Sequence, residues 1–257
     1  MLLITAIVLI RKDKVFAVRY PVYLYLGGAI GVLTTIFNNL AFGRISVSAI
    51  LALGLLGQSI TGLVIDQYGL FGMPKHPFTK NKLIGLFIII AGIGSMIDNF
   101  ELVAVAVSFV AGINIVLSRT LNAKLSDLTN VHIGTFYNYF IGLAVSAVVF
   151  IILGRNEMHL IDAGNVLSSN WHIYLGGILG VCVVLIFNII VVKISAFYLT
   201  LLVFVGQIFS GVLIDTVISR QVSPLVVTGG ILVALGLGIN LFLDSKKFKT
   251  ESPEKKQ

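Results

Sequence analysis

Charged residues are scarce in this chain, and their scarcity excludes a water-soluble globule. Only 11% of the 257 residues are charged, whereas 57% are hydrophobic. An average soluble domain carries about 25% charged residues. A chain of this size therefore has too little polar surface to face water on all sides, and its composition predicts an integral membrane protein.

The chain also lacks the residue patterns that enzymes and metal proteins need. Its single cysteine, Cys182, allows no internal disulfide, and we expect it to be a small core residue. The four histidines are scattered without metal-ligand spacing, and no G-x-S-x-G, H-E-x-x-H or nucleotide-binding loop is present. We therefore expect no enzyme activity, no metal and no cofactor. Without a nucleotide site, any active transport would depend on an ion gradient.

The formal net charge of +7 is not arranged as a basic face or stripe. The cations sit in short clusters between apolar runs, and they recur after every second run. This pattern is typical of cations that set membrane topology and does not indicate nucleic acid as a partner. The positive-inside rule then places the basic loops and the C-terminal tail in the cytoplasm.

Long apolar runs dominate the sequence, and a bilayer-spanning helix needs about 20 such residues. The runs do not alternate apolar and polar residues as barrel strands would, so we expect α-helices. Eight are predicted: Val22–Phe42, Ile45–Ile65, Leu83–Ile97, Leu102–Ser118, Ile133–Gly154, Ile173–Val192, Ile194–Ile214 and Gln221–Leu243. Met1–Ile10 is a ninth of half length, without the basic leader or cleavage site of a signal peptide.

The sequence repeats itself after 149 residues. GQSITGLVID (residues 57–66) returns as GQIFSGVLID (residues 206–215), and residues 25–66 align without a gap on residues 174–215. The shared positions include polar residues, so an internal duplication is the expected origin. Five predicted spans separate equivalent positions, and because five is odd, equivalent helices point in opposite directions across the membrane.

The expected fold is thus all-α, an inverted repeat of five-helix units. We predict a first repeat over residues 1–98, a second, inverted repeat over residues 99–243 and a cytoplasmic basic tail over residues 244–257. The first repeat is short by roughly one and a half helices, because nothing in it matches residues 101 to about 144. We therefore expect nine helices here, with the first of ten missing or truncated, most simply through a start codon placed too late.

Three segments resemble a known family. YLYLGGAIG, GQSITGLVIDQYGLFGMPKHPFT and NAKLSDLTN resemble the YdcZ-like branch of the drug/metabolite transporter (DMT) superfamily, in its fused two-repeat form. DQYGLFGMPKHP (residues 66–77) is the most specific part, and the resemblance covers nearly the whole chain. The chain departs from the family at its N-terminus and where DTVISRQVSP replaces the second glycine- and proline-rich loop. The resemblance implies a ten-helix, EamA-like fold in the bacterial inner membrane and movement of a metabolite or drug.

Amides inside the apolar runs are the candidates for substrate contact. Gln58 and Gln207 lie near the middle of equivalent runs, and inverted-repeat transporters hold substrate between the repeats at that depth. The alternative is a helix-to-helix hydrogen bond worth on the order of 1 kcal/mol. The full set of candidates is Gln58, Gln207, Asn114, Asn138 and Tyr137, the last from an aromatic cluster that would line a pocket or pack the core.

Further polar residues have expected roles in gating or packing. Asp66 and Asp215 end equivalent helices, where they would be gating or coupling carboxylates or, alternatively, solvated interfacial acids. Asn114 begins an i, i+4, i+8 polar stripe, continued by Ser118 and Asn122, that should face the bundle. For Asn39 and Asn188 a structural role is favoured, with cavity lining as the alternative. Close helix packing is expected at Gly27, Gly28, Gly31, Gly62, Gly176, Gly177, Gly180 and Gly211.

These observations predict a multi-pass inner-membrane transporter, secondary or facilitated, that moves an unidentified small molecule by alternating access between its repeats. The expected partners are the lipid bilayer and that substrate, and the sequence leaves a homodimer open. The competing hypothesis is a non-transporting membrane assembly factor or an inactive truncated remnant.

Overall fold

The structure is a computed structural model that describes residues 1–13, 20–45, 47–76, 101–154 and 175–218, together with Phe87, Thr228 and Ile231. All regular elements in these residues are helical, which confirms the all-helical prediction for this part of the chain. Four helices within it are long and apolar enough to cross a membrane: Val22–Ala41, Ala49–Tyr68, Leu102–Leu128 and Val131–Ile152. The spans predicted over residues 83–97 and 221–243, and the basic tail, lie outside the described residues apart from the three single positions above.

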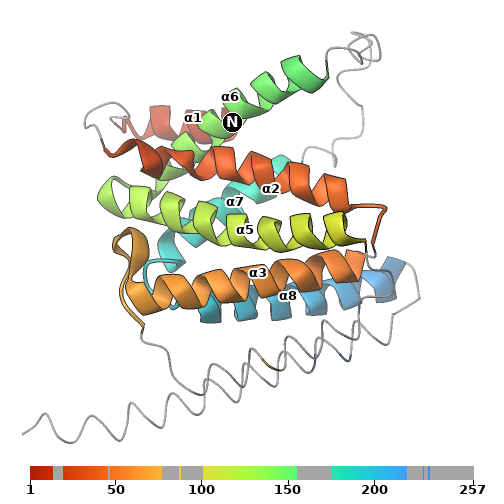
Figure 1. Cartoon of the computed structure of the whole chain (residues 1–257). Coiled ribbons are helices and arrows are strands. Elements are labelled where there is room, and N and C mark those ends of the chain that lie inside the picture. Colours follow the sequence, from red (N-terminus) through yellow and green to blue (C-terminus); the bar gives the residue numbers. More distant parts are fainter. Residues whose placement is uncertain are drawn as a thin grey trace, which may run out of the picture. The chain divides into compact units, whose positions relative to one another are not determined.

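Figure 1 shows the described elements in chain order. They are α1 (Leu2–Ile10), the 3-10 turn η1 (Val22–Leu26), α2 (Gly27–Ala41), α3 (Val47–Tyr68), the 3-10 turn η2 (Leu70–Gly72), α5 (Leu102–Leu128), α6 (Val131–Leu153), α7 (Leu175–Ile190) and α8 (Ala196–Ile218). If η1 is counted with α2, the helix ends lie within about four residues of the prediction except at α5, which continues past Arg119 to Leu128. The guanidinium of Arg119 lies over the Phe187 ring and does not end the helix.

The chain divides into two compact units. Unit one comprises residues 1–33, 71–73 and 117–193, and unit two comprises residues 34–70, 74–116 and 194–257. Each unit takes segments from the early and the late part of the chain. Packing therefore does not follow the order of the sequence.

Unit two is built around α3 and α8, which lie side by side and antiparallel (Figure 1). The direction follows from the contacts, because the C-terminal end of α3 meets the N-terminal end of α8. Gly62 of α3 brings the two backbones close, since a Cβ on this residue would lie 2.9 Å from the backbone nitrogen of Phe197. Apolar side chains of both helices form one buried cluster, which includes Ile50, Leu53, Leu55, Phe197, Leu201 and Phe204.

A second close crossing in unit two joins α3 to α5. A Cβ on Gly57 would overlap the carbonyl of Phe109, and one on Gly112 would overlap the carbonyl of Gly54. Lipid offers no hydrophobic driving force for helix association, so such backbone-to-backbone packing is a main source of attraction between the helices. Larger residues at Gly57 or Gly112 would force α3 and α5 apart.

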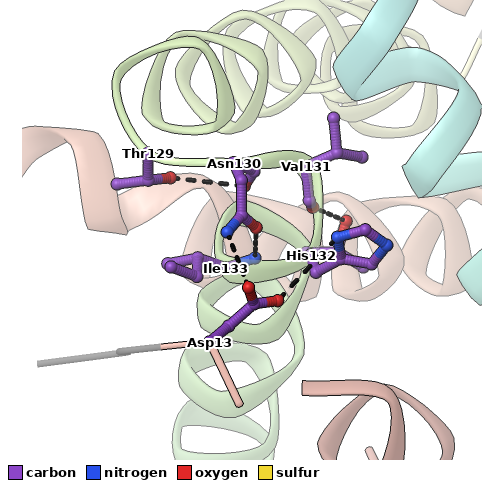
Figure 2. A network of polar contacts seen from close by, with 7 residues as sticks. Asp13, Thr129, Asn130, Val131, His132 and Ile133 are labelled. Atoms are coloured by element: carbon purple, nitrogen blue, oxygen red, sulfur yellow. Dashed lines mark hydrogen bonds and ion pairs between the residues drawn. The ribbon is translucent and has the colours of Figure 1, made fainter. Parts of the chain in front are cut away.

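In unit one, α6 begins at a capped turn (Figure 2). The side-chain oxygen of Asn130 accepts a hydrogen bond from the backbone nitrogen of Ile133 at 2.9 Å, which satisfies one of the free donors at a helix start. The Asn130 amide nitrogen in turn donates to Asp13 Oδ1 at 3.2 Å, and His132 Nδ1 lies 3.9 Å from the other carboxylate oxygen. The segment after α1 is thereby attached to the start of α6.

The α3–α5 crossing leads to a first prediction. Gly112→Ala should destabilise the fold by about 1–3 kcal/mol, the usual cost of overpacking, because the new methyl group would overlap the Gly54 backbone. The matched control is Gly206→Ala in α8 of the same unit, where no described atom lies within 4 Å of the new Cβ. The free energy of unfolding in mixed micelles measures both. A Gly112→Ala variant as stable as the control would contradict the crossing.

Candidate functional site

Among the described residues of unit two, the buried carboxylate of Asp66 accepts three hydrogen bonds. Its side chain is 3% exposed, near the end of α3. One oxygen, Oδ1, accepts from the backbone nitrogen of Ala196 at 2.9 Å. The other, Oδ2, accepts from the Ser195 hydroxyl at 2.5 Å and from the backbone nitrogen of Phe197 at 3.1 Å. We call this arrangement the Asp66 clasp.

The Asp66 clasp satisfies two electrostatic needs at once. A helix start leaves backbone N–H groups without partners and carries partial positive charge. A buried carboxylate requires donors, because an isolated charge in an apolar medium is very costly. The start of α8 supplies these donors, so the alternative of a solvated interfacial acid at Asp66 is wrong.

The spacing of glycine and aspartate explains how Asp66 reaches a backbone on another helix. Gly62 and Asp66 are four residues apart and share a helix face. Gly62 allows the α8 backbone to approach within contact of α3, and one turn later the carboxylate can bond that backbone directly. A side chain at Gly62 would separate the helices at the point where the clasp forms.

Residues 66–76, most of the segment DQYGLFGMPKHP, begin at Asp66 and fold back on it. The backbone nitrogen of His76 donates to the carbonyl of Asp66 at 2.8 Å. The turn between them uses three left-handed residues, Gly69 at φ 63°, Phe71 at φ 58° and Gly72 at φ 71°. Glycine adopts such angles without strain, whereas Phe71 does so at a cost. Asp66 is thus held through its carboxylate by α8 and through its carbonyl by the backbone nitrogen of His76.

Unit one holds a separate group of intramembrane amides. The Asn122 side-chain nitrogen in α5 donates to Asn138 Oδ1 in α6 at 2.8 Å and lies 3.4 Å from the Ser118 hydroxyl. Ser118 donates to the carbonyl of Gly27 at the start of α2 at 2.8 Å. Three helices therefore meet at these hydrogen bonds. Asn114 and Asn122 are both more than nine-tenths buried, which confirms that the polar stripe of α5 faces the bundle.

Two further polar contacts in unit one involve α7. Asn188 is buried, and its amide nitrogen donates to the Thr135 hydroxyl of α6 at 2.9 Å. The guanidinium carbon of Arg119 lies 5.2 Å from the ring centroid of Phe187, within the range of a cation–π interaction. Asn188 has the structural role expected of it, whereas its repeat equivalent, Asn39, is exposed.

The predicted substrate contacts fall into both units. In unit one, Asn138 takes part in the amide group, and the ring of Tyr137 lies edge-on to that of Tyr25 at a centroid distance of 4.6 Å. In unit two, Asn114 is buried, Gln58 is half-buried and Gln207 is exposed. The amide nitrogen of Asn114 has no hydrogen-bond partner among the described residues.

The predicted packing glycines also have different surroundings. A Cβ on Gly27 would overlap the Asn122 side chain, and one on Gly28 would overlap the Asn138 carbonyl. A Cβ on Gly31 would make an ordinary contact with Ser118, and one on Gly180 would lie 3.1 Å from the Tyr139 hydroxyl. Gly176 and Gly177 are exposed, with no described atom within 4 Å of an added Cβ. The surroundings of Gly211 and Asp215 lie outside the described residues.

Cys182 is exposed on α7, so its prediction as a core residue is wrong. A short apolar side chain on a membrane helix can face lipid as easily as protein, because both surroundings are apolar. Within the described residues, no three histidine, cysteine, aspartate or glutamate side chains gather in a way that could hold a metal ion.

Sequence reasoning missed Ser195 as the partner of Asp66, although a signal was present. A serine directly before an apolar helix is a typical N-cap, and Ser195 precedes α8 in the motif K-I-S. It also missed Thr135 as the partner of Asn188, for which the sequence holds no signal, because the two residues lie on helices that only tertiary packing brings together.

The clasp predicts that stability depends on the charge of Asp66. Asp66→Asn places an amide where three donors need an acceptor, and hydrogen bonds to a charged group are worth about 1.5–3 kcal/mol. We expect a loss of that size in the free energy of unfolding, measured in mixed micelles. Asp127→Asn makes the same chemical change at a carboxylate that is 48% exposed and paired with Lys124, where about 0–1 kcal/mol is expected. Equal losses for the two variants would contradict the clasp.

The amide group predicts coupling between Asn122 and Asn138. A double-mutant cycle with alanine at both positions should give a coupling energy of about 0.6 kcal/mol, and at most about 1.7 kcal/mol, the range for hydrogen bonds between membrane helices. The control cycle pairs Asn122 with Asn130, which shares no partner with it, so those effects should add. The same cycle energy for both pairs would show that no specific bond joins Asn122 and Asn138.

Comparison with known families places the chain among membrane transporters. A family model described as "Putative inner membrane exporter, YdcZ" matches residues 1–94 and 103–239. Comparisons with curated proteins and with solved structures gave no match. The matched residues include the clasp, the amide group and the segment DQYGLFGMPKHP. Because the model covers most of the sequence and describes a transporter rather than an enzyme, the chain belongs to the YdcZ family of inner-membrane exporters.

Proposed function

We propose that the chain exports a small molecule across the inner membrane by alternating access between two inverted repeats. The observation that carries this proposal is the pairing of α3 with α8. The two helices begin at Val47 and Ala196, which are 196 − 47 = 149 residues apart, the offset of the sequence repeat. This shared offset supports their treatment as equivalent elements, and their antiparallel packing agrees with an inverted repeat.

A second helix pair supports the same duplication. The helices α2 and α7 end at Ala41 and Ile190, again 190 − 41 = 149 residues apart. The ends of these two helices thus share the offset of the sequence repeat. In transporters with inverted repeats, one repeat rocks against the other around a substrate held near the membrane centre.

Asn114 is the best-supported substrate contact among the predicted residues. It lies at the thirteenth position of α5, near the middle of a 27-residue helix. Its amide nitrogen is buried and has no acceptor among the described residues, and a buried donor without an acceptor costs about 1–3 kcal/mol. A substrate with a carbonyl, carboxylate or ether oxygen would supply that acceptor. Gln58, half-buried on α3 of the same unit, is a second candidate.

A stabilisation screen tests this function. The purified full-length chain is heated with each member of a panel of small metabolites and drug-like compounds, and those that raise its Tm are tested for export from preloaded cells. We expect at least one compound to do both. Asn114→Ala should weaken its binding roughly two- to tenfold, as expected for one lost hydrogen bond.

The control is Asn39→Ala, the same change at an exposed asparagine, which should leave binding unchanged. Export that is unaffected by Asn114→Ala would remove this residue from the site. If no compound stabilises the protein and none is exported, the transport proposal fails as a whole.

A further inference from the structure

We propose that the Asp66 clasp is a latch that opens and closes one end of the α3–α8 pair during transport. The inference rests on the proposed function, because alternating access requires movement between the two repeats. The clasp joins the end of α3, from the first repeat, to the start of α8, from the second. It is therefore a bond between the two parts that must move.

The clasp is held by hydrogen bonds, which can break and form again as the helix ends separate and approach. It consists of three hydrogen bonds that one carboxylate accepts, and no salt bridge to Asp66 is present among the described residues. Asp66 lies two residues before the end of α3 at Tyr68, so a small separation of the helix ends would bring its carboxylate into contact with water. The carboxylate would then exchange protein donors for water donors, which limits the cost of opening.

The start of α8 has a second cap that needs no residue from α3. The backbone nitrogen of Tyr198 donates to the hydroxyl of Ser195, three residues earlier, at 3.4 Å. This is the usual hydrogen bond of an N-cap serine. Asp66 accepts from the backbone nitrogens of Ala196 and Phe197, whereas Ser195 accepts from that of Tyr198. One cap of α8 therefore remains when Asp66 leaves.

The carbonyl of Asp66 adds a link to the turn that follows. Because the backbone nitrogen of His76 donates to this carbonyl, the two ends of the segment from Asp66 to His76 are joined by a hydrogen bond at the latch. The left-handed Phe71 in that turn stores backbone strain. Opening of the latch would thus also affect the hydrogen bond between His76 and the carbonyl of Asp66.

Thiol labelling tests the latch without a known substrate. Cys182, which is exposed, is replaced by serine, and Ala196→Cys is introduced next to the latch, where all three donors to Asp66 are kept. Ala196 is 8% exposed, so its thiol reacts with N-ethylmaleimide only while the latch is open. The control is Ala52→Cys in α3, which is 2% exposed in the apolar cluster of the same unit. Both full-length variants are labelled in native membrane vesicles.

We expect Cys at position 196 to react at least tenfold faster than Cys at position 52, and Asp66→Asn to raise the rate at position 196 several-fold further. Equal rates at the two positions would show a permanent cap and overturn the latch. A fast rate at position 196 that Asp66→Asn leaves unchanged would also overturn it, because opening would then not depend on the carboxylate.

The two proposals fail in different ways. A chain whose latch opens but which exports no compound would contradict the export function and leave the latch intact. Export that proceeds while position 196 stays as unreactive as position 52 would contradict the latch alone.

Discussion

The burial of one carboxylate governs the arrangement of unit two. The carboxyl group of Asp66 is 3% exposed, and a polar group in such surroundings requires hydrogen-bond partners. The start of α8 provides backbone donors and positive potential at the same place. The position of α8 against α3 is thus set at one end by electrostatics, and the apolar cluster between the two helices fills the space that this contact defines.

Glycine makes that contact geometrically possible. A hydrogen bond to a backbone nitrogen requires the two backbones to approach closely, and Gly62 removes the side chain that would prevent it. The same principle operates at Gly57 and Gly112 in unit two, and at Gly28 in unit one. Because lipid is as apolar as the protein interior, these crossings and a few buried hydrogen bonds replace the hydrophobic effect as the force between helices.

The repeat in the sequence and the units in the structure divide the chain differently. Each unit combines helices from both predicted repeats, as α3 and α8 do in unit two. Equivalent residues can therefore meet different neighbours. Asn39 is exposed while Asn188 is buried against Thr135, and Gln58 is half-buried while Gln207 is exposed. An alignment of the two halves predicts that such residues correspond. Their surroundings, however, depend on neighbouring helices that are not equivalent in the two halves.

The sequence by itself determined the class of the protein, most helix boundaries, the inward face of the α5 stripe and the family, because composition and periodicity act locally along the chain. It also marked Asp66 as a residue with a special role. Only the tertiary structure decided what that role involves. A carboxylate at the end of one helix and a serine before another carry no sign of each other in sequence, since 129 residues separate Asp66 from Ser195. Their contact arises from the close packing of α3 and α8, which is a property of the folded chain.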